Sequence, residues 1–382
     1  MAPHTVNWGI MATGWIAETF CKDLLTNPAS RDVTDVAHRI AAVSSSRDAQ
    51  KARDFVEKID APADTTVYGS YAELVRDPEV DIIYVATPHS HHFQNAMLAL
   101  DAGKNVLCEK ALTVTAEQTR VLVETARAKK LFFMEAVWTR YFPSASSGAI
   151  GKVHRTTADL SFNNCTEGSD RLSFADSHRM VNPELAGGAL LDLGIYSLTW
   201  LFQTLYHLQP EKEAPEVLAS VQKYPVTGAD ESTAVILNFP RNQQTGIATT
   251  SLRVDTAPDG KGSTAPAIRI QGSKGEIQVA HPAFRPLSYK VIRKGVEEVE
   301  VVDCPIPTDE ARKWGHGMFW EADECARCLR DGRLESASLP LSESLVIMET
   351  MDSTIKQGGI KYPALITTHE FDAKSPLNLG NA

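Results

Sequence analysis

The chain has 382 residues, too many for one ordinary core, so its length indicates two domains. A formal net charge of −10 at pH 7 disfavours nucleic acid and anionic membranes as partners. The N-terminus has no signal-peptide pattern, and we find no run of about 18 apolar residues that would predict a membrane span. Six scattered cysteines fit a reducing compartment, and we therefore expect a cytoplasmic protein.

The first 140 residues alternate between apolar strands and amphipathic helices. Strands are predicted at residues 6–11, 39–43, 67–68, 82–86, 105–108 and 131–134. Helices are predicted between them at residues 15–25, 49–58, 71–75, 91–102 and 116–129. This alternation indicates a doubly wound parallel sheet of the Rossmann type, which we place in a domain at residues 1–140.

Residues 141–382 are expected to form a second, α+β domain. Strands of alternating polarity are predicted at residues 152–162, 216–224, 233–239, 245–253, 267–271, 276–280 and 287–293. Their turns contain Gly, Pro and Asn in place of helices, which indicates a large, mostly antiparallel open sheet with one exposed face. An apolar helix at residues 189–206 is expected to cover the other face, and helices at 318–330 and 342–356 end the chain.

The first predicted strand leads into a turn that is suited to a dinucleotide. Gly14 keeps the central place of the G-x-G-x-x-G pattern, with Ala12 and Ala17 at its flanking places. A lone glycine between a strand and a helix most often only makes a turn, but this strand–turn–helix context favours cofactor binding. Gly14, Trp15 and Ile16 are then expected to meet the pyrophosphate at the helix N-terminus.

The end of the second strand indicates which dinucleotide is bound. It reads Ser44-Ser45-Ser46-Arg47, where folds that bind NAD place an acid for the ribose 2′-hydroxyl. A guanidinium and a hydroxyl suit a 2′-phosphate, so Arg47 and Ser46 favour NADP. The alternative is a solvated arginine that opens the next helix, and Asp48 leaves part of this choice open.

Lys110 follows Glu109 at the carboxyl end of the fifth strand. Lysines at strand ends are most often only solvated, but side chains here point into the crevice where open α/β sheets bind ligands. Further along, Asp192 and Tyr196 lie four residues apart on the apolar helix and would share one of its faces. Tyr196 could equally be a core tyrosine.

Four motifs together resemble one family. They are Thr87-Pro88-His89-Ser90-His91-His92, Glu109-Lys110, the run from Gly187 to Tyr196, and Glu135-Ala-Val-Trp138-Thr-Arg140. In this combination the chain resembles the Gfo/Idh/MocA oxidoreductase family. Within that family, the likeness is strongest to the branch of dimeric dihydrodiol dehydrogenases and fungal NADP-dependent D-xylose dehydrogenases.

The resemblance implies roles for these residues. Lys110, Tyr196 and Asp192 are the implied catalytic groups, and a nearby ammonium such as that of Lys110 would lower the pKa of a phenol from about 10. Trp138 and Arg140 are implied to border the substrate. The residues implied to contact the cofactor are Thr87, Pro88, His89, His92, Glu109 and Lys110. We expect no metal, because neither the histidine run nor Cys325-Ala-Arg-Cys328 has a compatible second ligand set nearby.

The implied reaction is the NADP-dependent oxidation of the C1 hydroxyl of D-xylose to D-xylono-1,5-lactone. The alternatives are oxidation of a trans-1,2-dihydrodiol by the same residues, or a catalytically silent NADP-binding sensor. The resemblance also implies a homodimer formed through the C-terminal sheets. Two places depart from the family pattern: Ala111 replaces a proline after Glu-Lys, and only residues 144–150 stand where relatives carry a helix of several turns.

Overall fold

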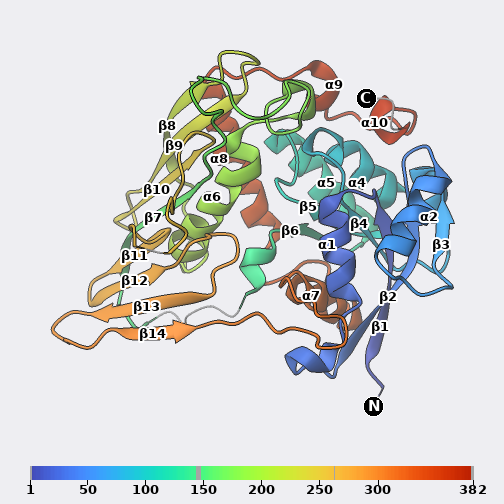
Figure 1. Ribbon diagram of the computed structural model, residues 1–382, viewed down its shortest axis with the longest axis horizontal. Coiled ribbons are helices and arrows are strands. Elements are labelled where there is room, and N and C mark those ends of the chain that lie inside the picture. The colour runs from blue at the N-terminus through green and yellow to red at the C-terminus, as the bar shows by residue number, and fades with distance from the viewer. Residues whose placement is uncertain (1, 143–147, 262, 380–382) are drawn as a thin grey trace. The chain divides into compact units, whose positions relative to one another are not determined.

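The computed structural model describes residues 2–142, 148–261 and 263–379 (Figure 1). They form two compact units. The first comprises Met1–Phe142, Ile306–Ser344 and Ala364–Ala382, and the second Pro143–Pro305 and Leu345–Pro363. The predicted domain limits of 1–140 and 141–382 differ from this division, because two C-terminal segments pack with the first unit. The short stretch predicted as a departure at 144–150 lies mainly within residues 143–147, outside the described residues.

The first unit contains a six-stranded parallel sheet in the order β3-β2-β1-β4-β5-β6. Its strands are β1 His4–Met11, β2 Val36–Ser44, β3 Thr66–Tyr68, β4 Ile82–Val85, β5 Asn105–Glu109 and β6 Phe133–Ala136. The chain order reverses between β1 and β4, which is the switch point where such sheets bind ligands at their carboxyl edge. The Rossmann-type fold predicted from the alternating pattern is confirmed.

Helices cover both faces of this sheet, so its central strands are apolar throughout. All four residues of β4 are buried. Tyr84 of this strand stacks on Phe20 of α1, while its neighbours Ile83 and Val85 join the core beneath α4 and α5. The helices of this unit are α1 Trp15–Leu24, α2 Ala49–Lys58, α3 Tyr71–Leu74, α4 His92–Asp101, α5 Ala116–Lys129, α7 Phe319–Arg330, α9 Ala364–Thr367 and α10 Pro376–Leu379.

The second unit contains an eight-stranded sheet in the order β14-β13-β12-β11-β7-β10-β9-β8. Its strands are β7 Val153–Ser161, β8 Glu216–Lys223, β9 Asp230–Phe239, β10 Gln244–Ser251, β11 Ile268–Gly272, β12 Gly275–Val279, β13 Ser288–Arg293 and β14 Glu300–Asp303. Only β7 and β10 pair in parallel, which confirms the mostly antiparallel sheet. Strand β14 was not predicted, because it has only four residues and most of them are exposed.

The apolar helix predicted at 189–206 lies along one face of this sheet but is not a uniform α-helix (Figure 1). It consists of a π-helical turn Leu190–Gly194, the α-helix α6 Ile195–Leu201 and a second π-helical turn Phe202–Tyr206. Single π turns occur often at functional sites. The last long helix, α8 Leu341–Gln357, runs from the first unit into the second.

Within the described residues, one segment that includes this helix is long and apolar enough, by length and composition alone, to cross a membrane. Pro183–Tyr206 has a mean hydropathy of 1.4 over its most apolar window, which by length and composition would suffice. However, 94% of that window is buried inside the structure. Its apolar character is therefore accounted for by packing on the sheet.

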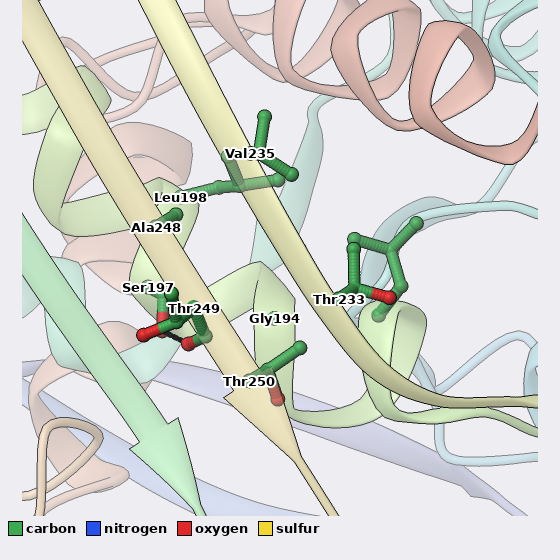
Figure 2. Close-up of a pocket in the computed structure, with 9 residues that line it drawn as sticks. Gly194, Ser197, Leu198, Thr233, Val235, Ala248, Thr249 and Thr250 are labelled. Carbon is green, nitrogen blue, oxygen red and sulfur yellow. Dashed lines mark hydrogen bonds between the residues drawn. The ribbon is translucent and has the colours of Figure 1, made fainter. Parts of the chain in front are cut away.

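A small seam between this helix and strands β9 and β10 shows how close the packing is (Figure 2). It has no room for a water molecule. Ser197 donates a hydrogen bond to the carbonyl oxygen of Thr249 across it, at 3.0 Å. This contact is close side-chain packing that fixes the helix on the sheet.

The N-terminus of the helix is held by a buried carboxylate. Oδ2 of Asp230, the first residue of β9, accepts the backbone N–H of Leu190 at 2.6 Å. This approach requires Gly188, because a Cβ there would lie 1.8 Å from Oδ1 of Asp230. The Gly-Gly motif therefore sets where the helix that carries Asp192 and Tyr196 begins.

We expect Gly188→Ala to destabilise the protein more than Gly228→Ala. Both glycines have positive φ, +145° and +81°, but a Cβ on Gly228 meets no described atom within 4 Å. Gly228→Ala should cost about 1–2 kcal/mol of unfolding free energy from backbone strain alone. Gly188→Ala should cost more, because Asp230 must also leave the helix N-terminus. Urea unfolding measures both losses, and equal losses would contradict the role given to Asp230.

Candidate active site

The turn after β1 leaves the first N–H groups of α1 open to an anion. Gly14 precedes the helix, and no side chain among the described residues caps it. A Cβ on Gly14 would meet no described atom within 4 Å, so the backbone there is approachable. Ala12 takes the left-handed conformation, with φ 98°, that the first glycine of the pattern usually adopts. Gly14, Trp15 and Ile16 therefore fit a bound pyrophosphate.

After the end of β2, Asp48 acts as the N-cap residue of α2. Its side chain accepts the backbone N–H of Gln50 at 2.8 Å and so caps the N-terminus of α2. The place next to β2 is held by serines, of which Ser45 is buried and Ser46 half-buried, followed by the exposed Arg47. This set of hydroxyls and one guanidinium fits a ribose 2′-phosphate better than a 2′-hydroxyl.

The histidine run after β4 makes contacts with its own backbone surroundings. The fully buried His92 has Nδ1 2.9 Å from the carbonyl oxygen of Ala111 and Nε2 2.9 Å from that of Thr87. Burial lowers the pKa of His92 to about 4, so the neutral ring donates to one of them at a time. His92 thus joins the loops after β4 and β5. Its predicted contact with the cofactor stays a prediction.

Thr87 is the residue of this loop that best fits a ligand contact. Its hydroxyl is buried and has no hydrogen-bond partner in the part of the chain that the structure describes. His89 lies in the same loop, with its ring perpendicular to that of His92 and 5.6 Å away. Within the described residues, no group of three or more His, Cys, Asp or Glu side chains is arranged to hold a metal.

Glu109 points into the unit, below Lys110. Its Oε1 accepts the Tyr84 hydroxyl at 2.5 Å, and its Oε2 accepts the backbone N–H of Lys110 at 3.2 Å. Burial and the charge of Glu109 raise the pKa of Tyr84 well above its usual value. Lys110 itself is half-buried, and the peptide bond between Lys110 and Ala111 is cis. Glu109 therefore links the buried Tyr84 to the backbone of Lys110, and its contact with the cofactor stays a prediction.

The two residues predicted to border the substrate differ in their surroundings. Trp138 stacks on His316, with ring centroids 4.8 Å apart and 11° between planes. Arg140 is buried, forms a 2.7 Å ion pair with the equally buried Glu343, and donates through Nε to the carbonyl oxygen of Ser338. These internal partners account for part of its guanidinium, and the substrate role of Arg140 stays a prediction.

Sequence analysis missed His316. Its ring also stacks against Trp314, with centroids 6.2 Å apart, and meets the edge of Trp15 at 6.4 Å. The segment is held by Asp23 of α1, which accepts the backbone N–H groups of His316, Met318 and Phe319 at 2.8, 2.6 and 3.2 Å. Burial raises the pKa of Asp23 to about 6, against the lowering effect of these N–H groups. No local motif marks this return of the chain.

The second unit carries the remaining predicted catalytic residues. Asp192 lies in the first π-helical turn, where its Oδ1 accepts Nη1 of Arg179 at 2.8 Å. Tyr196 in α6 is buried to 7% exposure, and its ring lies 5.8 Å from that of Phe284. The two residues occupy one short stretch of helix, as predicted, although its first turn is π-helical. Arg179 was not predicted, because it lies in a loop without periodicity.

Together these features define a class of protein. The first sheet has a switch point, an uncapped helix N-terminus, a second strand that ends in three serines and one arginine, and a lysine at the end of β5. This combination is typical of a dinucleotide-dependent oxidoreductase. Residues 6–137 match the family model described as an oxidoreductase family with an NAD-binding Rossmann fold. Residues 145–278 match the GFO/IDH/MocA C-terminal domain. The chain belongs to the Gfo/Idh/MocA family, as its motifs indicated.

Individual relatives are similar over almost the whole chain. The D-xylose 1-dehydrogenase (NADP(+)) of Hypocrea jecorina is 66% identical, covering 99% of this chain and 98% of that protein. The human trans-1,2-dihydrobenzene-1,2-diol dehydrogenase is 35% identical, covering 94% and 98%. The solved aldose-aldose oxidoreductase of Caulobacter crescentus, in complex with glycerol, has a TM-score of 0.71 at 21% identity, covering 93% and 98%, and shows the shared fold.

Glu135 provides a pH test of how the first unit is held together. Its Oε1 accepts the N–H of Leu112 at 3.1 Å and its Oε2 accepts the hydroxyl of Ser344 at 2.6 Å. Burial raises the pKa of Glu135 from 4.5 to about 7. Because the folded state then holds its proton more tightly than the unfolded state, its stability is greatest below about pH 4.5 and falls progressively as the pH rises from 4.5 to about 7.

We therefore expect Glu135→Gln to gain stability relative to the unmodified protein between pH 5 and pH 8. Between pH 5 and pH 8, the unfolding free energy of the variant minus that of the unmodified protein should rise by about 2–3 kcal/mol, from a shift of roughly two pKa units. Urea unfolding at both pH values measures it. Glu57→Gln, on the exposed side of α2, should show no such change. A constant difference for Glu135→Gln would contradict the buried charge.

Proposed function

We propose that this protein is an NADP-dependent oxidoreductase that converts D-xylose to D-xylono-1,5-lactone at the C1 hydroxyl. The observation that carries the proposal is the 66% identity, over 99% of the chain, to a protein named D-xylose 1-dehydrogenase (NADP(+)). This chain also carries the strand-end lysine Lys110, the Asp192–Tyr196 pair and the serine-rich end of β2, which the motifs assign to that chemistry.

The residues of the first unit support NADP as the cofactor. Gly14, Trp15 and Ile16 would hold the pyrophosphate on the N-terminus of α1. Ser46 and Arg47 would hold the 2′-phosphate, while the Oδ1 atom of Asp48 is engaged as the cap of α2. The unpartnered hydroxyl of Thr87 would meet the cofactor at the carboxyl edge of β4.

Bound NADP supplies a nicotinamide C4 that accepts the hydride from C1. The protein must then remove the proton of the C1 hydroxyl as the C1–O bond becomes a carbonyl. We assign this proton to the hydroxyl oxygen of Tyr196. A phenol has an ordinary pKa of about 10, so a cation is needed to favour the phenolate, and the family resemblance implies Lys110 for that role. Asp192 orients the reacting hydroxyl.

A second candidate is the oxidation of a trans-1,2-dihydrodiol by the same residues. The 35% identity to the human dihydrodiol dehydrogenase over 94% of the chain favours it. The family resemblance implies that Trp138, which stacks on His316, borders the substrate, and an aromatic ring suits a sugar ring and a diol ring alike. A third candidate is a catalytically silent NADP-binding sensor. The presence of both Lys110 and Tyr196 argues against it.

NADPH formation with D-xylose, D-glucose and a trans-1,2-dihydrodiol, assayed in parallel, separates these functions. We expect the highest kcat/KM with D-xylose. A preference for the dihydrodiol would replace the first proposal with the second. NADP binding without turnover of any substrate would support the sensor.

We also propose a cytoplasmic homodimer. The outer face of the second sheet supports this assembly, because Leu218 on β8 lies directly opposite Ile236 on β9 and the two are 64% and 40% exposed. Ile236 in turn lies opposite Ile247 on β10, which extends the apolar stripe. Such a stripe on a sheet suits a copy of the same face. The six free cysteines fit a reducing compartment, which localisation of a fluorescent fusion would test.

Light scattering should give about twice the chain mass of 41.8 kDa. Ile236→Asp, which places a charge in the stripe, should shift the protein to the monomer without loss of fold. A monomer at micromolar concentration in the unmodified protein would refute the dimer.

The cofactor assignment predicts a selective effect of Arg47→Ala. The KM for NADP should rise by roughly 10-fold or more, since a charge-assisted contact to phosphate contributes about 1.5–3 kcal/mol. The KM for NAD should stay nearly unchanged, because NAD lacks the 2′-phosphate. Arg53→Ala, an exposed arginine on α2, is the matched control. Equal losses for NADP and NAD would contradict the assignment.

The proton-transfer assignment predicts that Tyr196→Phe lowers kcat by roughly 10²-fold or more with NADP affinity unchanged. Lys110→Met should act similarly, and the double variant should lose little more than either single one, because both serve one step. Tyr206→Phe, which removes a hydroxyl from the other end of the same helix, should keep full activity. Full activity in Tyr196→Phe would transfer the role of base to Lys110 or Asp192.

A further inference from the structure

Arg179 lies beside one of the predicted catalytic residues, and no sequence motif accounts for it. Its Nη1 is 2.8 Å from Oδ1 of Asp192. The carboxylate side chain is 10% exposed, whereas the guanidinium side chain is 50% exposed. We propose that Arg179 is a positioning residue that fixes the orientation of the Asp192 carboxylate, an inference that rests on the function proposed above.

The loop that carries Arg179 is built to approach the helix N-terminus closely. A Cβ on Gly187 would lie 2.6 Å from the carbonyl oxygen of Arg179, so only glycine allows the loop to pack there. The carbonyl oxygen of His178 accepts the backbone N–H groups of Val181 and Asn182 at 3.0 and 2.9 Å. Asn182 in turn accepts the N–H of Gly187 at 2.9 Å. These bonds fix the backbone of Arg179 relative to Asp192.

Stability alone does not explain this ion pair. Two other arginines, Arg31 and Arg140, form pairs whose side chains are at most 2% exposed, as expected of structural contacts. Ion pairs with a solvent-exposed member contribute only about 0–1 kcal/mol. Arg179 thus gives little to the folded state, yet its planar guanidinium restricts how the buried carboxylate can turn.

The chemical consequence follows from the position of Asp192, four residues before Tyr196 on one stretch of helix. A carboxylate that orients the substrate hydroxyl must keep one rotamer relative to the base. A misplacement of about 1 Å in such a group can cost roughly 10²-fold in rate. Loss of Arg179 should therefore lower kcat while cofactor binding and folding stay intact.

The test compares three variants in the NADP-dependent oxidation of D-xylose. Arg179→Ala should lower kcat by roughly 10- to 100-fold, with an unchanged Kd for NADP and an unchanged Tm. Arg179→Lys should recover part of this loss, since it keeps the charge but not the planar fork. Arg171→Ala is the matched control, because Arg171 forms an exposed pair with Asp176 at 2.9 Å in the same loop region. It should retain full activity.

Two further measurements separate positioning from a merely structural role. Guanidinium ion, far below denaturing concentrations, should restore activity to Arg179→Ala but not to Asp192→Asn, because the half-exposed site is open to a small cation. Arg179→Ala combined with Asp192→Asn should lose no more than Asp192→Asn alone. Full activity in Arg179→Ala, or a loss that adds fully to that of Asp192→Asn, would overturn the proposal.

A readout without substrate keeps this test independent of the proposed function. Crystal structures of the unmodified protein and of Arg179→Ala should show the Asp192 carboxylate in different orientations. An unchanged orientation overturns the inference whatever the enzyme oxidises. Absence of activity of the unmodified protein with D-xylose and with the dihydrodiol would instead refute the proposed function.

Discussion

Three buried carboxylates, those of Asp23, Glu135 and Asp230, accept backbone N–H groups from segments that are distant in sequence. Asp23 accepts hydrogen bonds from the backbone of the segment from His316 to Phe319. Glu135 accepts the N–H of Leu112, and Asp230 accepts the N–H of Leu190. Burying a carboxylate without hydrogen-bond partners costs free energy, so burial of each of these acids requires that its distant segment has packed against it. Local folding around the site is thereby coupled to long-range packing within each unit.

Each of these acids lies close to a predicted chemical group without needing to react. Glu135 fixes Leu112, two residues after Lys110, and Asp230 fixes the helix that begins just before Asp192. Asp23 fixes the segment of His316, which stacks on Trp138. The cost is visible in their titration, because burial raises the pKa of Asp23 and Asp230 to about 6 and that of Glu135 to about 7. The site geometry is thus maintained against an unfavourable burial of charge.

The arginines of this chain illustrate why residue type alone does not assign a role. Arg140 lies in a motif that resembles one of the family, yet its guanidinium forms a buried ion pair with Glu343. Arg179 lies in an irregular loop, yet it contacts Asp192 and remains half-exposed. Asp48 and His92 show the same difference, since a helix cap and a bridge between two loops account for their contacts. In each case the partner, rather than the residue, decides what the side chain does.

The sequence by itself determined the architecture of both sheets, the dinucleotide turn and the family. Apolar strands such as β4 and alternating strands such as β9 carry their burial pattern in neighbouring residues: Val235 and Leu237 are buried while Ile236 is 40% exposed. Only the tertiary structure decided that residues 306–344 return to the first unit, that the site helix begins with a π turn, and that Arg179 holds Asp192. The physical reason is range. Periodicity is set by the local backbone geometry of a strand or helix, whereas hydrogen bonds and ion pairs between distant side chains exist only after the core has packed.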